Sequence, residues 1–180
     1  MMQSELDVLG DVSARLNALG LPFMLTGSFA LAFYATPRMT RDLDIVVAVE
    51  ANQIADLTVA FASDYFVDAD LIRSALSAES LFNLMHYGTG IKVDLIIRKS
   101  SPYRLLEFSR RRQVQFGSVN IWIVSAEDLI LSKLVWAKES GSELQLRDVR
   151  LLLAGAVEVD YLRRWARELD VAPRLEELLA

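Results

Sequence analysis

The sequence predicts an α+β fold, in which a small mixed β-sheet with flanking helices is followed by a C-terminal helical subdomain. Two observations predict this class. Short apolar, β-branched runs, such as residues 43–49 and 93–97, alternate with stretches whose apolar residues recur every three or four positions. Beyond residue 125, only the helical spacing remains. Strands and helices that alternate first and then give way to helices are typical of α+β proteins.

The composition sets limits on the class of protein. With 180 residues, of which 53% are hydrophobic and 24% charged, the chain can bury a substantial core. We expect a core unit at 1–124 with a helical subdomain at 125–180 packed on it. No apolar stretch approaches the ~20 residues of a membrane span, and the first residues do not resemble a signal peptide. The absence of cysteine excludes disulfides and cysteine nucleophiles and favours the cytoplasm.

The first third of the chain alternates helices and strands. Leu9, Val12 and Leu16 recur at helical spacing, and Gly20 ends that helix. The apolar run at 42–49 is too continuous for a solvent-facing edge, so we expect a central strand there. The elements expected around it are a strand at 23–26, a helix at 29–34 and a helix at 54–61.

The remainder is predicted from turns and caps. Gly88-Thr89-Gly90 joins two strands into a hairpin, and Gly117-Ser118 joins two more. The strands expected are 65–67, 81–87, 91–97, 113–116 and 119–124. The helices expected are 71–76, 126–138, 142–154 and 160–169, the last of them ending before Pro173.

The most informative motif is Asp42-Leu43-Asp44, at the start of the central strand. Side chains two positions apart on a strand point to one face, so both carboxylates converge. Two like charges repel unless a cation lies between them, and carboxylate oxygens suit Mg²⁺ or Mn²⁺. An isolated Asp-x-Asp is more often a turn or a solvated edge. Here a third carboxylate, Asp94, begins another apolar strand, which favours a site for two-metal phosphoryl chemistry.

Gly27-Ser28 is a candidate phosphate-binding turn, because it lies between a predicted strand and a predicted helix. Such a turn is often only a helix cap. However, glycine allows close backbone approach, and a helix N-terminus presents free N–H groups to an anion. The Ser28 hydroxyl adds a further donor.

Together these motifs resemble the polymerase-β-like nucleotidyltransferase superfamily. Its pattern is an apolar strand ending in Gly-Ser or Gly-Gly, an Asp-x-Asp at the start of the next strand, and a third Asp on a later strand. Here that pattern is Gly27-Ser28, then Asp42-x-Asp44 fourteen residues beyond the serine, then Asp94. The Gly-Ser motif is common to active and inactive members.

A narrower likeness is to the AbiEii-type abortive-infection toxins. Arg38 and Thr40 precede the aspartate pair at alternate positions, as in that branch. The run 125–129, followed by Lys133 and Asp148, is similar to it as well.

The resemblance implies an enzyme that moves a nucleoside monophosphate from a triphosphate to an acceptor hydroxyl on RNA, protein or a small molecule. It also implies an antitoxin-like partner protein, and it does not imply a membrane. The implied ligands of Mg²⁺ or Mn²⁺ are Asp42, Asp44 and Asp94. The implied nucleotide-binding residues are Gly27, Ser28, Arg38, Thr40 and Lys133. The implied catalytic residues are Asp42, Asp44, Asp94, Lys133 and Asp148.

The alternative function is a non-catalytic module that senses a nucleotide or binds a partner on the same fold. The complete set of three carboxylates favours the enzyme. Lys133 and Asp148 also allow two interpretations, because each shares a helical face with apolar residues. They either form a structural ion pair between two helices, or Lys133 contacts the triphosphate and Asp148 lies near the acceptor or the lysine. Trp122, Trp136 and Trp165 are expected in packing positions.

Overall fold

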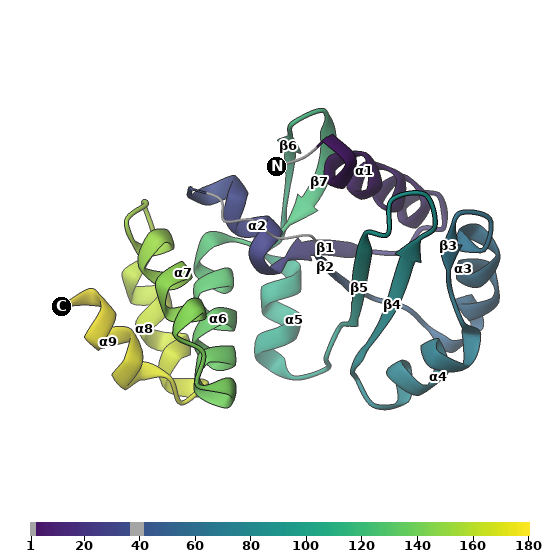
Figure 1. Ribbon diagram of the computed structural model, residues 1–180. Helices are drawn as coiled ribbons and strands as arrows, with labels where there is room; N and C mark the ends of the chain where they lie inside the picture. The colour runs from purple at the N-terminus through teal and green to yellow at the C-terminus, as the bar shows by residue number, and fades with distance from the viewer. Residues whose placement is uncertain (1–2, 37–41) are drawn as a thin grey trace.

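The computed structural model describes residues 3–36 and 42–180, and it confirms the predicted α+β fold (Figure 1). The strands of the described residues form one mixed sheet in the order β3-β4-β5-β2-β1-β7-β6. Their bounds are β1 (Phe23–Thr26), β2 (Leu43–Val47), β3 (Tyr65–Phe66), β4 (Leu81–His86), β5 (Lys92–Ile97), β6 (Arg112–Phe116) and β7 (Val119–Ile123).

Strand β2 lies in the middle of this sheet, as its continuous apolar run predicts. It pairs antiparallel with β1 on one side and parallel with β5 on the other. Both predicted hairpins, β4–β5 and β6–β7, are present. The parallel pairing matters most for the site, because it brings two stretches about fifty residues apart in sequence into the same row.

The helices gather toward two ends of the molecule (Figure 1). Helices α1, α3 and α4 lie at the right in this view, α6 to α9 lie at the left, and α5 stands between β5 and α6. No helix of the described residues is long and apolar enough to cross a membrane. The bounds are α1 (Gln3–Ala18), α2 (Gly27–Tyr34), α3 (Ile54–Phe61), α4 (Ala69–Ser77), α5 (Pro102–Ser109), α6 (Ala126–Ser140), α7 (Glu143–Leu153), α8 (Val159–Glu168) and α9 (Ala172–Leu179).

The two faces of β2 have different environments. Leu43, Ile45 and Val47 are fully buried and belong to the main hydrophobic core. Asp44 and Val46 point to the opposite face and are only half-buried. This alternation follows from the two-residue period of a strand. One face of the central strand therefore stabilises the fold, and the other is left for a cleft.

Two helices have no counterpart in the sequence prediction. Helix α9 contains Pro173 in its first turn, where a proline starts a helix rather than ending one. Helix α5 is only eight residues long and buries Tyr103, Glu107 and Phe108 together, so a charged residue interrupts its apolar face. That interruption hides the helical period on which the prediction relies.

Asp128 joins three of the helices. It lies in the first turn of α6 and is fully buried. Its carboxylate accepts hydrogen bonds from Ser125 Oγ at 2.6 Å, Tyr161 Oη at 2.6 Å and Arg110 Nε at 3.1 Å. Tyr161 belongs to α8 and Arg110 follows α5, so one carboxylate connects both helices to α6. The division into units at residue 125 stays a prediction.

Candidate active site

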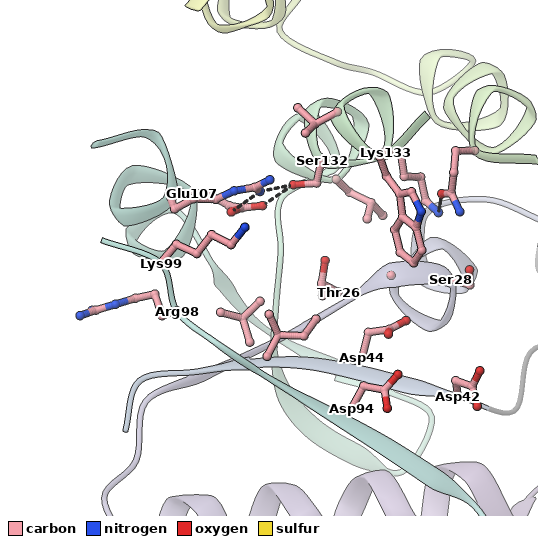
Figure 2. Close-up of a pocket in the computed structure, with 18 of the residues that line it drawn as sticks. Thr26, Ser28, Asp42, Asp44, Asp94, Arg98, Lys99, Glu107, Ser132 and Lys133 are labelled. Atoms are coloured by element: carbon pink, nitrogen blue, oxygen red, sulfur yellow. Dashed lines mark hydrogen bonds and ion pairs between the residues drawn. The ribbon is translucent and has the colours of Figure 1, made fainter. Parts of the chain in front are cut away.

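One cleft of about 590 Å³ opens between the sheet and helices α5, α6 and α7 (Figure 2). Its volume lies within the range of small-molecule sites. The cleft is lined from the sheet side by Thr26 of β1, Asp44 of β2 and Asp94 of β5. Other lining residues predicted from the sequence are Gly27, Ser28, Asp42 and Lys133.

The pairing of the strands gathers the carboxylates. Asp44 is the register partner of Asp94 on one side and of Thr26 on the other, and Asp94 is in turn opposite Asn83 of β4. Residues directly opposite one another point to the same face of a sheet, so these four side chains form one row. Asp42 lies two positions before Asp44. Figure 2 shows the carboxylates of Asp42, Asp44 and Asp94 at one end of the cleft.

The electrostatics of this group are unfavourable in the ion-free protein. Burial and, after it, the charges of Asp94 and Asp42 raise the pKa of the Asp44 carboxyl to about 6. Lys92 offsets part of the charge, because its Nζ lies 3.0 Å from Asp94 Oδ2 and 3.9 Å from Asp42 Oδ1. The Asn83 amide also donates a hydrogen bond to Asp94. A cation near Asp44 would relieve the remaining repulsion.

Gly27 brings the start of α2 directly against Asp44. Its φ of +66° is in the left-handed region that favours glycine. A Cβ at this position would lie 2.0 Å from Asp44 Oδ2 and 2.6 Å from its Cγ. No other residue fits without moving Asp44. The turn therefore sets the first N–H groups of α2 beside the carboxylates, and Ser28, which is 9% exposed, follows it.

Lys133 and Asp148 form a buried ion pair. Lys133 Nζ donates to Asp148 Oδ2 at 2.7 Å and to Gln145 Oε1 at 3.0 Å. Lys133 lines the cleft, whereas Asp148 is 1% exposed and is not among the lining residues. The structural pair expected between two helices is thus present. A contact of Lys133 with a triphosphate stays a prediction.

Arg38 and Thr40 lie outside the described residues. Their predicted role in nucleotide binding stays a prediction as well.

The carboxylate oxygens of the cleft suit a hard cation whose remaining ligands come from water and substrate. Nowhere among the described residues do three or more carboxylate, imidazole or thiolate groups form a ready-made cage for a metal ion. Mg²⁺, however, usually binds one or two carboxylates and completes its shell with water and substrate phosphates. Asp42, Asp44 and Asp94 supply oxygens of that kind beside a helix N-terminus. The residues therefore fit metal ions that arrive with a triphosphate.

The opposite wall of the cleft carries a polar cluster that the sequence motifs did not predict. Arg104 and Glu107 of α5 and Ser132 of α6 are joined by hydrogen bonds (Figure 2). Ser132 gave the one available signal, because it and Lys133 are the only polar residues within 129–137. The expectation for Trp136 is wrong: its side chain lines the cleft and is 54% exposed, so it is not a packing residue.

Comparison with known proteins identifies relatives. The family model of the nucleotidyl transferase AbiEii toxin, of type IV toxin–antitoxin systems, matches residues 12–170. No curated protein matches the chain.

Several solved structures share the fold. An antigenic nucleotidyltransferase-like protein from Paracoccidioides brasiliensis is 18% identical with a TM-score of 0.62, over 99% of this chain and 94% of that one. The antibiotic-resistance factor ANT(2'')-Ia is 14% identical with a TM-score of 0.64, over 100% of both chains. The lincosamide antibiotic adenylyltransferase LnuA is 14% identical with a TM-score of 0.53, over 84% of this chain and 96% of that one. At these identities the likeness shows the fold.

Proposed function

This chain belongs to the AbiEii family of nucleotidyltransferase toxins, and on that premise we propose that it transfers a nucleoside monophosphate from a nucleoside triphosphate to an acceptor hydroxyl by two-metal catalysis. The observation that carries the proposal is the row of Asp44 and Asp94 beside the start of α2. It brings oxygens suited to a metal ion and N–H groups suited to a phosphate to one end of one cleft.

The carboxylates divide the work of the transfer. Asp42 and Asp44 would hold both metal ions, and Asp94 would share one of them. In the reaction, the acceptor oxygen forms a bond to the α-phosphorus while the bond from that phosphorus to the pyrophosphate oxygen breaks. Asp94 accepts the proton of the attacking hydroxyl. Bound Mg²⁺ or Mn²⁺ would supply positive charge to the attacking and leaving oxygens.

The triphosphate is held by groups on the helices that face the carboxylates. The N–H groups at the start of α2 and the hydroxyl of Ser28 offer hydrogen bonds to phosphate oxygens. Lys133 adds an ammonium group from α6. Its positive charge also acts on Asp44, where it opposes the rise in pKa of that carboxyl. Lys133 therefore lies near enough to the carboxylates to serve the same substrate.

The acceptor and the partner follow from the family more than from the cleft. The family name describes a toxin of a type IV toxin–antitoxin system, so we include an antitoxin-like protein among the partners. Among structures of similar fold, LnuA is an antibiotic adenylyltransferase. RNA, protein and small molecules are therefore all acceptors to test.

The first experiment separates the metal–nucleotide site from the rest of the protein. With Mg²⁺ and a nucleoside triphosphate, the melting temperature of the protein should rise, because a ligand selective for the folded state stabilises it. The double variant Asp42→Asn/Asp44→Asn should lose that rise. Asp56→Asn/Asp160→Asn, which removes two exposed carboxylates outside the cleft, is the matched control. An unchanged rise in the first double variant places the nucleotide elsewhere.

Turnover distinguishes the enzyme from a nucleotide-sensing module. The protein is incubated with each labelled triphosphate and with total cell RNA or protein. Transfer of label that requires Asp94 supports the enzyme, whereas tight binding without transfer supports the module.

The ion pair of Lys133 offers a test of its own. Lys133→Met should cut transfer sharply if the ammonium contacts the triphosphate. If the lysine only neutralises Asp148, the single variant should instead be unstable, and Lys133→Met/Asp148→Leu should recover stability. Chemical unfolding and a transfer assay on both variants separate the two roles.

A further inference from the structure

Trp136 differs from the other tryptophans of the chain. Trp165 packs against Tyr103 with 5.2 Å between ring centroids, and Trp122 lies 4.9 Å from the guanidinium carbon of Arg111. Trp136 makes no such ring contact with any described residue, and 54% of it is exposed. A large flat apolar surface is therefore left open on the wall of a cleft. Aromatic side chains in such positions contribute binding area for a planar ligand.

The position of Trp136 relates it to the candidate triphosphate site. Ser132, Lys133 and Trp136 all line the cleft from α6. Trp136 follows Lys133 by three residues, so it stands about 4.5 Å further along the helix axis on the same side. A planar group linked by a sugar to a triphosphate that touches Lys133 would come within reach of the indole.

A preorganised polar cluster lies on the same wall. Arg104 Nη1 donates to Glu107 Oε2 at 2.8 Å and to Ser132 Oγ at 2.6 Å, and Ser132 donates to Glu107 Oε1 at 2.6 Å. Glu107 is 4% exposed, so these bonds fix the guanidinium from its buried side.

The other edge of that guanidinium is open. Nε and Nη2 of Arg104 have no hydrogen-bond partner among the described residues, and neither atom is sealed from solvent. Because Arg104 lines the cleft, these donors are available to a ligand.

We propose that this wall is the nucleobase subsite of the triphosphate, in which Trp136 stacks on the base and Arg104, oriented by Glu107 and Ser132, donates to its edge. The inference rests on the proposed function and deepens it. Every nucleobase offers a flat face for stacking and a carbonyl oxygen or ring nitrogen as an acceptor. The acceptor substrate fits this wall less well, because it must approach Asp94, whose register partner on β4, Asn83, has an exposed side chain.

The test compares two probes that differ by the base and sugar. Affinities of the protein for Mg²⁺–nucleoside triphosphates and for Mg²⁺–tripolyphosphate are measured by calorimetry. Trp136→Ala should weaken the nucleotides about tenfold, as lost stacking does elsewhere, and should leave tripolyphosphate unchanged. Trp136→Phe should recover most of the loss because it restores an aromatic face. Ser132→Ala, which removes one support of Arg104, should weaken nucleotides several-fold with the same selectivity.

Fluorescence gives an independent readout. Nucleotide should quench the emission of the wild-type protein, and the quenching should disappear in Trp136→Phe and persist in Trp122→Phe. An equal loss for both probes in Trp136→Ala, or no loss for either, overturns the subsite. If the wild type binds tripolyphosphate as tightly as nucleotides, only this inference fails. If it binds neither probe, the proposed function fails with it.

Discussion

Asp128 and the cleft carboxylates Asp42, Asp44 and Asp94 show how partners decide what a buried charge does. Asp128 is fully buried and accepts hydrogen bonds from three hydroxyls and a guanidinium. Asp44 is half-buried beside two like charges, and its pKa is raised to about 6. A partnered buried carboxylate holds elements together, whereas a repelled one destabilises the fold until a cation arrives. Asp128 therefore stabilises the fold, and the cleft carboxylates are suited to ligand binding.

Local structure explains the contrast. Asp128 lies in the first turn of a helix, where Ser125 caps the N-terminus and its hydroxyl is within reach. Asp44 and Asp94 lie on adjacent strands in register, which places like side chains on the same face at about 5 Å. Charge reversal or removal should thus have opposite effects on stability at the two places.

The largest effect is expected from Asp128→Ala. It leaves the hydroxyls of Ser125 and Tyr161 and the Nε of Arg110 without the carboxylate that accepts their hydrogen bonds. Removal of one member of a buried charged network costs about 3–5 kcal/mol, and urea unfolding would measure that loss. Nucleotide binding by the folded fraction should persist. A loss of unfolding free energy below about 1 kcal/mol, the size of a lost helix cap, would show that Asp128 does not hold the three helices together.

Gly27→Ala should be the next most damaging change. It combines a residue with a Cβ at φ +66° with a Cβ position 2.0 Å from Asp44 Oδ2. We expect a loss of about 2–4 kcal/mol from backbone strain and overpacking, together with loss of metal-dependent nucleotide binding. Gly141→Ala is the control, because Gly141 has a φ of +68° and no neighbour within 4 Å of its Cβ position. Equal effects of the two substitutions would show that the close approach of Gly27 to Asp44 contributes nothing to the loss.

The sequence was sufficient for the parts of the site that depend on strand geometry. The two-residue period of a strand predicts that Asp42 and Asp44 share a face, and both line the cleft, although Asp42 lies one residue before β2. The central position of β2 follows from its continuous apolar run. Asp94 was predicted from the same kind of run and from the family pattern. Gly27 was predicted from its place between a strand and a helix, although its close approach to Asp44 appears only in the tertiary structure.

The far wall was not predictable, for a physical reason. Arg104 and Glu107 belong to a helix whose charged residue is buried, so no hydrophobic period marks it. Trp136 looks like a packing residue in any periodic pattern, because only the tertiary arrangement decides whether a cleft lies in front of it. The sequence allows Asp148 a position near the acceptor or the lysine, and only the structure shows that it pairs with Lys133 outside the lining of the cleft.

A moderate effect of opposite sign is expected from Asp44→Asn. Between pH 3.8 and about 6 the unfolded chain loses the Asp44 proton while the folded protein keeps it, so stability falls as the pH rises. Above about pH 6 this penalty is complete, at about 2 kcal/mol after allowance for partial exposure. Asp44→Asn should therefore be more stable than the wild type at pH 7, and the two should converge near pH 4. Urea unfolding across this range, without metal, checks the difference, and a less stable variant at pH 7 would contradict the repulsion.

The smallest effect is expected from Lys92. This residue pairs with two of the cleft carboxylates, so in that respect they resemble Asp128. Its ammonium lies 3.0 Å from Asp94 and 3.9 Å from Asp42, so it competes with a metal ion for these carboxylates. Lys92→Met keeps most of the apolar stem and removes the competing charge. Because the lysine is 36% exposed, the coupling is that of a partly solvated pair, up to about 1 kcal/mol. We expect Mn²⁺, measured by spin resonance without nucleotide, to bind up to about fivefold more tightly, while the metal-free protein becomes slightly less stable. Lys138→Met, which removes an exposed ammonium paired with Asp170 outside the cleft, should change neither quantity. Weaker Mn²⁺ binding in Lys92→Met would mean that the ammonium orients Asp94 rather than competing for it. The cleft carboxylates would then be held in place by their partners, as Asp128 is.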